Sequence, residues 1–147
     1  MSIIKMEWDI LVGIVIGFCL SIISMVLKKE YEVRVEKRLK KESIRDELAE
    51  NIASFCTYWE DRRCSIDMEI GDFRENVKTY IKDIQERYRA GARYLDQKII
   101  SEIREVCNGF ISITNQSPDS DDEKWFNSVK DEGNKLNERF DNILSKL

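Results

Sequence analysis

The chain has 147 residues, of which 42% are apolar and 35% are charged, with six glycines and a single proline. This composition is too apolar for a disordered chain and too poor in glycine and proline for a loop-rich all-β fold. The net charge of -4 argues against a binder of nucleic acid polymers. The absence of histidine excludes Ser-His and Cys-His catalysis, histidine-containing zinc sites and a histidine pH switch.

Residues 10–27 form a run of 18 uncharged, mostly apolar residues. At about 1.5 Å per residue, a helix of this run covers roughly 27 Å, which is close to the hydrocarbon thickness of a bilayer. We therefore predict a transmembrane helix over 10–27, preceded by a short extracytoplasmic N-terminus over 1–9. A buried core helix is the alternative, but no charge interrupts the run. A cleaved signal peptide is disfavoured, because basic residues do not dominate the first nine positions.

A basic stretch follows the apolar run and forms a predicted juxtamembrane stalk over 28–42. Its net charge over residues 28–41 is +4, from seven basic and three acidic side chains. Basic residues next to a span stay in the cytoplasm, so we expect the N-terminus outside the cell membrane and residues 28–147 inside. The same side chains suit anionic lipid headgroups. They are Lys28, Lys29, Arg34, Lys37, Arg38, Lys40 and Lys41.

Small residues recur every four positions within the apolar run, at Gly13, Gly17 and Ser21. This spacing places them on one helix face, where small side chains let two membrane helices approach closely. We therefore predict self-association through this face into a homo-oligomer. In the stalk, Tyr31, Val35 and Leu39 also share one stripe, as in a solvated helix or a loose coiled coil.

The remainder, 43–147, shows helical periodicity throughout and none of the alternation of a β-strand. We predict an all-α protein, in which a single N-terminal transmembrane helix continues into a helical stalk and an antiparallel cytoplasmic bundle of about four helices. The bundle helices are expected over about 43–61, through 66–88, through 95–113, and from near Asp121 to Leu147. A turn near Ala90–Ala92, at Gly91, is favoured over one long helix through both middle segments.

The segment around this turn combines guanidinium groups with aromatic rings, the chemistry that holds phosphate and stacks a base. It is a candidate contact for an anionic ligand or for lipid. The alternative is a turn whose tyrosines pack on the bundle and whose arginines pair with nearby acids. The candidate residues are Arg87, Tyr88, Arg89, Arg93 and Tyr94.

The remaining patterns favour no enzyme, metal or cofactor. A carboxylate cluster at Asp119, Asp121, Asp122 and Glu123 lacks the ligand spacing of an EF-hand and suits a helix start instead. The four cysteines are scattered without CxxC spacing, as expected for unpaired thiols in a reducing compartment. We expect no catalytic residues, no cofactor and no bound metal.

Two function classes remain after these exclusions. The layout resembles that of single-pass bacterial division adaptors in architecture, which implies a non-enzymatic scaffold that presents its bundle to an unidentified cytoplasmic protein. It is also similar in general logic to small anchored proteins of bacterial antiviral defence. In that case the bundle senses an anionic nucleotide and the spans perturb the bilayer.

Overall fold

The computed structural model describes residues 2–62, 70–116 and 122–147, and the side chains among these except for 2–7, 9, 122 and 123. The described residues form four α-helices: α1 (Ser2–Arg62), α2 (Ile70–Ala90), α3 (Gln97–Asn115) and α4 (Asp122–Leu144). The chain divides into an N-terminal unit, residues 1–40, and a bundle unit, residues 41–147. The all-α prediction is confirmed.

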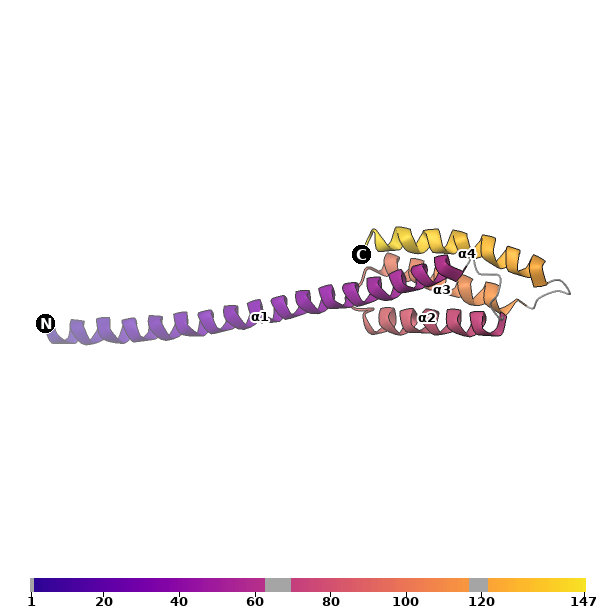
Figure 1. Cartoon of the computed structure of the whole chain (residues 1–147). Coiled ribbons are helices and arrows are strands. Elements are labelled where there is room, and N and C mark those ends of the chain that lie inside the picture. Colours follow the sequence, from indigo (N-terminus) through magenta and orange to yellow (C-terminus); the bar gives the residue numbers. More distant parts are fainter. Residues whose placement is uncertain (1, 63–69, 117–121) are drawn as a thin grey trace. The chain divides into compact units, whose positions relative to one another are not determined.

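The N-terminal unit is the first part of α1, and its described side chains are exposed. This part of α1 has no glycine or proline between Phe18 and Lys40, so nothing in the sequence interrupts the helix after the apolar run. Figure 1 draws residues 2–40 as one continuous helical ribbon.

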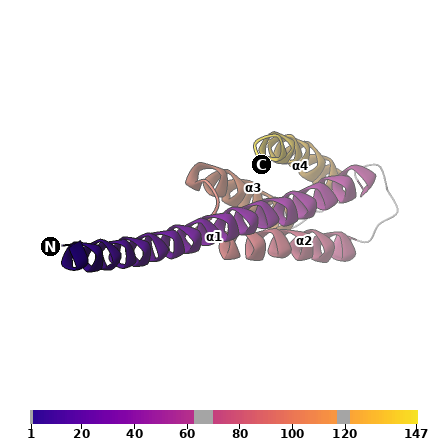
Figure 2. The ribbon, with the colours of Figure 1, turned by 90° about the vertical axis from the view of Figure 1, so that its left-hand side faces the viewer.

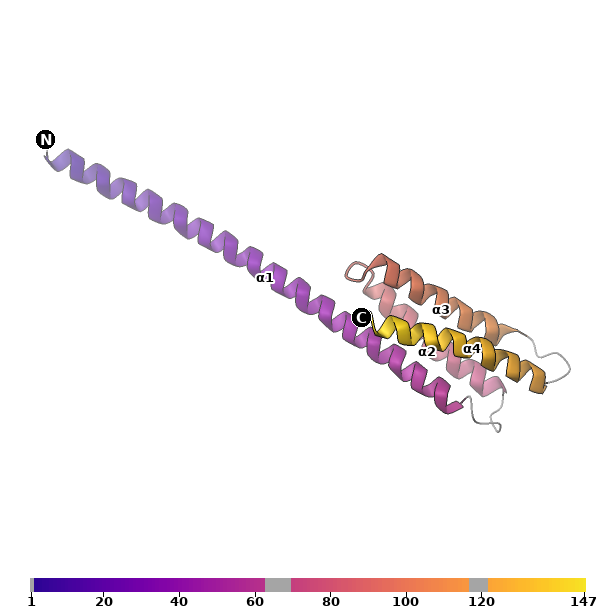
Figure 3. The same cartoon turned by 90° about the horizontal axis from the view of Figure 1, so that it is seen from above.

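The bundle unit consists of the last part of α1 and the whole of α2, α3 and α4. Figures 1 and 2 show α2 and α4 on opposite sides of this part of α1. The C-terminus and the α2–α3 turn lie together at one end of the bundle (Figure 3). The Arg45 guanidinium, near the start of the bundle part of α1, donates a hydrogen bond to the Lys146 carbonyl at the same end.

The bundle core is aromatic at its centre, where Phe55 of α1 meets all three other helices. Its ring centroid lies 4.7 Å from that of Phe110 in α3, 5.7 Å from that of Phe140 in α4 and 6.0 Å from that of Tyr80 in α2. Aliphatic side chains extend the core along the helices. The fully buried ones include Leu48, Ile52, Val77, Ile81, Ile84, Ile103, Val106, Val129 and Ile143.

The predicted helix positions agree closely with the structure. The helix predicted to end near 61 ends at Arg62, the predicted turn at Gly91 separates α2 from α3, and the last helix begins at Asp122. Asp96 caps α3 by accepting a hydrogen bond from the Lys98 amide at 2.7 Å. Part of the predicted start of the second helix, including Ile66, lies outside the described residues, as do Asp119 and Asp121 of the carboxylate cluster.

Candidate functional site

The apolar run from Ile10 to Leu27 is exposed along its whole length. Its mean hydropathy is 2.8 and none of it is buried, so the described residues contain one helix long and apolar enough to cross a membrane. The exposed side chains include Ile14 (65%) and Phe18 (67%). A helix in the core of a soluble protein would bury such residues, whereas none of this run is buried within its own unit.

The predicted self-association face lies open on this helix. A Cβ added at Gly13 or at Gly17 would meet nothing within 4 Å, and Ser21 is exposed. Within the described part of the N-terminal unit, nothing covers these positions. The prediction that a second copy packs there remains a prediction.

The seven basic residues of the stalk are exposed as well. At 3.6 residues per turn they are distributed around the whole circumference of α1 rather than along one face. Arg34 forms an ion pair with Glu30, 2.5 Å apart, one helical turn earlier. This distribution is compatible with anionic headgroups surrounding the helix, and with a topology signal that needs no single face.

The α2–α3 turn is built on Gly91. The Gly91 amide donates to the Arg87 carbonyl at 3.0 Å, and the Gly91 carbonyl accepts from the Tyr94 amide at 2.8 Å. A Cβ at Gly91 would lie 2.3 Å from Cγ2 of Ile44, so α1 and the end of α2 approach too closely here for a larger residue. The need for glycine at this position is therefore steric rather than conformational.

The five candidate ligand residues of this turn differ in their burial. Tyr88 is 3% exposed and belongs to the core, and its contact with a ligand or lipid stays a prediction. Arg87 forms an ion pair with Glu47 of α1, 2.6 Å apart. Arg89 and Arg93 are exposed, and Tyr94 is half-buried. Sequence periodicity already placed Tyr88 on the apolar face of α2, whereas the Arg87–Glu47 pair depends on how the helices meet.

A groove beside Arg87 is lined by Asn51, Asp83, Glu86 and Ala90 in addition to Arg87 itself. The carboxylates of Asp83 and Glu86 would repel an anion, and the Arg87 guanidinium is already paired with Glu47. The packed tyrosine and the paired arginine match the alternative that treats the segment as a structural turn. Arg89 and Arg93 are the two arginines of the set that lie outside this groove lining.

A second polar groove between α1 and α2 was not expected from the sequence. Its lining includes Ser54, Tyr58, Asp61, Arg62 and Tyr80. The rings of Tyr58 and Tyr80 lie 5.0 Å apart between centroids, and the Tyr58 hydroxyl is buried. Burial raises the pKa of Tyr58, which keeps the phenol neutral. No motif in the sequence indicates this groove, because its lining residues come from two different helices.

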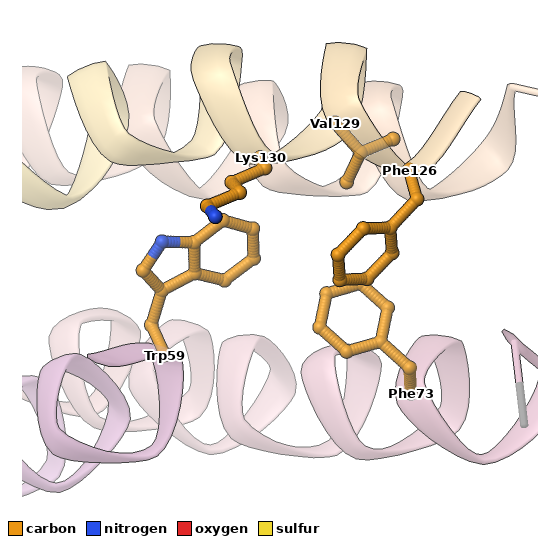
Figure 4. A pocket seen from close by; sticks show the side chains of 5 residues that line it. All are labelled: Trp59, Phe73, Phe126, Val129 and Lys130. Atoms are coloured by element: carbon orange, nitrogen blue, oxygen red, sulfur yellow. The ribbon is translucent and has the colours of Figure 1, made fainter. Parts of the chain in front are cut away.

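The apolar cavity in the bundle is too small for a ligand. Its volume is about 10 Å³, and Figure 4 shows the Trp59 and Lys130 side chains at one side of it and Phe73, Phe126 and Val129 at the other. This volume corresponds to about one water molecule at most. The cavity is a packing imperfection rather than a binding site.

The buried thiols lack the properties of nucleophiles. Burial raises the pKa of Cys107 to about 12, and burial together with the nearby Asp141 carboxylate raises the pKa of Cys56 to about 12. Both thiols stay protonated at neutral pH, and a thiol rather than a thiolate reacts poorly. Among the described residues, no group of three or more cysteine, aspartate or glutamate side chains could hold a metal ion.

Comparisons with known proteins found no family model, no curated protein and no solved structure that matches this chain.

Proposed function

We propose that this chain is a single-pass, membrane-anchored and self-associating helical-bundle protein, which acts as a non-enzymatic scaffold or adaptor at the cytoplasmic face of the cell membrane. The observation that supports it most directly is the division of apolar surface. Among the described side chains, the large exposed hydrophobic ones lie between Trp8 and Leu39, whereas those of 41–147 are buried or half-buried. The first part therefore suits lipid and the second suits water.

Anchoring predicts that the protein stays in the membrane fraction after extraction with alkaline carbonate. Leu20→Arg places a charge within the run, which costs about 2.5–3.5 kcal/mol at the centre of a membrane helix. Tyr31→Arg, outside the run, is the matched control. The variant in the run should shift toward the soluble fraction, and equal extraction of both variants would contradict the anchor.

The orientation with the N-terminus outside follows from the basic stretch after the span. Protease added to intact cells should leave the bundle unit whole, and the same protease added after permeabilisation should digest it. Digestion of the bundle in intact cells would show that the topology is opposite to the one proposed. A C-terminal epitope tag reports both results.

Self-association through the small-residue face is the next part of the proposal. Gly13→Leu together with Gly17→Leu adds bulk at the two open glycines and should reduce energy transfer between donor-labelled and acceptor-labelled chains in membranes. Val15→Leu adds bulk on nearly the opposite side of the helix and is the control. Equal energy transfer in both variants would exclude packing at this face.

A second candidate, a membrane-perturbing effector that senses an anionic nucleotide, has one supporting observation. Arg89 at the end of α2 and Arg93 in the α2–α3 turn are exposed, and Arg93 precedes the half-buried Tyr94. Expression with a membrane-potential dye separates the two functions, because an effector depolarises the cell and an adaptor does not. Titration of the full chain in detergent with cyclic and linear nucleotides tests the sensor, and a flat response excludes those ligands.

A further inference from the structure

The stalk carries apolar side chains that neither the predicted membrane span nor the bundle accounts for. Four large hydrophobic residues beyond Lys28 are exposed: Tyr31 (69%), Leu39 (60%), Val33 (41%) and Val35 (37%). Among the described residues of the bundle unit, by contrast, no large hydrophobic side chain is exposed. Among the described side chains, the exposed large apolar ones outside the apolar run and Trp8 therefore lie in the stalk.

Three of these residues form one surface, which we call the stalk face: Tyr31, Val35 and Leu39. They follow one another at intervals of four residues within the uninterrupted helix α1, so they lie along one side of it. Val33 lies about 160° from Val35 around the axis, since each residue turns the helix by about 100°. The stalk face is thus a narrow stripe on one side, and Val33 belongs to nearly the opposite side.

Between Tyr31 and Leu39, the charged residues beside the stalk face are sorted by sign. At about 100° per residue, Glu32 and Glu36 lie about 60° and 100° to one side of Val35, while Arg38 and Arg34 lie about 60° and 100° to the other side. All four side chains are exposed. The stalk face therefore has one acidic edge and one basic edge.

This arrangement is complementary to itself in one orientation. When two identical helices pack parallel about a two-fold axis, each edge of one helix faces the other edge of its partner, as the e and g positions do in a parallel coiled coil. Glu32 and Glu36 of one copy then face Arg34 and Arg38 of the other. In an antiparallel pair, like edges would meet and repel. Exposed ion pairs contribute little affinity, but they select orientation and partner.

We propose that the stalk face is a self-pairing surface at which a second copy of this chain packs parallel and in register. The inference rests on the proposed membrane anchoring, which holds both copies in the same direction. Each stalk-face residue also follows a small residue of the span by 18 positions, which is about five helical turns. Gly13, Gly17 and Ser21 therefore lie on the same side of α1, and one partner helix can cover both stripes.

Cysteine cross-linking of the full chain in isolated membranes tests the surface with a matched pair of variants. Val35→Cys places a thiol at the centre of the stalk face, and Val33→Cys places one on nearly the opposite side, two positions away. A thiol oxidant should give several-fold more product of twice the chain mass with Val35→Cys. Equal yields, or a product with Val35→Cys whose mass is not twice that of the chain, would overturn the proposal.

Charge reversal tests whether the edges choose the partner. A chain with Glu32→Lys and Glu36→Lys has two basic edges, and a chain with Arg34→Glu and Arg38→Glu has two acidic edges. In the Val35→Cys background each chain alone should lose several-fold of its dimer yield, and the two chains mixed should recover it. Undiminished yields in either chain alone, or no recovery on mixing, would contradict pairing through these edges.

Energy transfer between donor-tagged and acceptor-tagged chains separates this inference from the proposed function. If energy transfer occurs but Val33→Cys and Val35→Cys cross-link equally, the chain self-associates but not through the stalk face. That result would overturn only the present inference. Absence of energy transfer would overturn the proposed self-association as well.

Discussion

The indole ring of Trp59 in α1 lies directly against Gly133 in α4. A Cβ added at Gly133 would be 1.9 Å from Cζ2 and 2.3 Å from Cη2 of the ring. The Trp59 Nε1 donates a hydrogen bond to Oδ1 of Asn134 at 3.0 Å, so the ring is held both by its face and by its polar edge. Only glycine allows α4 to approach α1 this closely.

Gly133→Ala should therefore destabilise the bundle, although alanine is ordinarily the better helix former. Trp59 is 2% exposed and packs against the rings of Phe73 and Phe110, so overpacking should lower the free energy of unfolding by about 1–3 kcal/mol. Gly71→Ala in α2 is the control, because a Cβ there meets nothing within 4 Å and should change stability by at most about 1 kcal/mol. Denaturant unfolding of the full chain in detergent measures the stability of both variants. Equal stability of the two would show that the Trp59 ring moves to make room for the added methyl group.

Phe55→Ala should be among the most damaging substitutions in the chain. Its fully buried ring contacts aromatic rings in α2, α3 and α4, so its removal leaves a cavity that all four helices border. The expected loss is about 3–5 kcal/mol in the free energy of unfolding. Phe18→Ala, at a residue 67% exposed in the apolar run, should leave the unfolding of the bundle unchanged. A loss below 1 kcal/mol for Phe55→Ala would mean that the aromatic centre collapses around the cavity.

The buried thiols predict a loss of stability at alkaline pH. Burial raises the pKa of Cys56 and of Cys107 from 9.0 to about 12, so between pH 9 and 12 the unfolded chain has released protons that the folded chain retains. The free energy of unfolding should fall through this range because the unfolded state binds fewer protons. Cys107→Ala, which leaves no thiol at one site, should make the fall shallower.

Maleimide labelling at pH 8, followed by mass spectrometry, checks the same property directly. Cys56 and Cys107 should react slowly in the folded protein and rapidly in denaturant, because only the unfolded chain exposes them and restores their ordinary pKa. Rapid labelling of either residue under native conditions would contradict their burial.

Arg74 should stabilise the contact of α2 with the C-terminal end of α3 and with the first turn of α4. Its guanidinium lies 4.8 Å from the ring centroid of Trp125 and donates to the Gln116 carbonyl at 2.5 Å, which also accepts from Trp125 Nε1 at 3.0 Å. Arg74→Ala should lower the free energy of unfolding by about 1–2 kcal/mol and shift the emission of Trp125. Lys78→Ala removes only an exposed ion pair with Glu75 and should change stability by less than about 0.5 kcal/mol.

The main elements of the fold were predictable because their signals are local. The 18 uncharged residues from Ile10 to Leu27 identify a candidate span by length and composition, and the buried positions of α2 repeat with the period of a helix. The turn at Gly91 followed from a single glycine between two periodic segments. Each of these features depends on residues close together in the sequence.

The candidate ligand site was less predictable, since it depends on contacts between helices. Tyr88 has the same residue type and neighbourhood as Tyr94, yet it is buried while Tyr94 is half-buried, because only Tyr88 continues the apolar face of α2. The pairing of Arg87 with Glu47 joins residues 40 positions apart. No pattern within the segment from Arg87 to Tyr94 contains that information.

By itself the sequence determined the helical class, the apolar segment and the places where helices begin and end, since backbone preference and amphipathic period are properties of short stretches. Only the tertiary structure decided which glycines are close contacts, at Gly133 against Trp59 and Gly91 against Ile44, and which charges are paired across the bundle. The physical reason is that packing joins side chains separated by tens of residues, and their distance in space is set by the docking of whole helices.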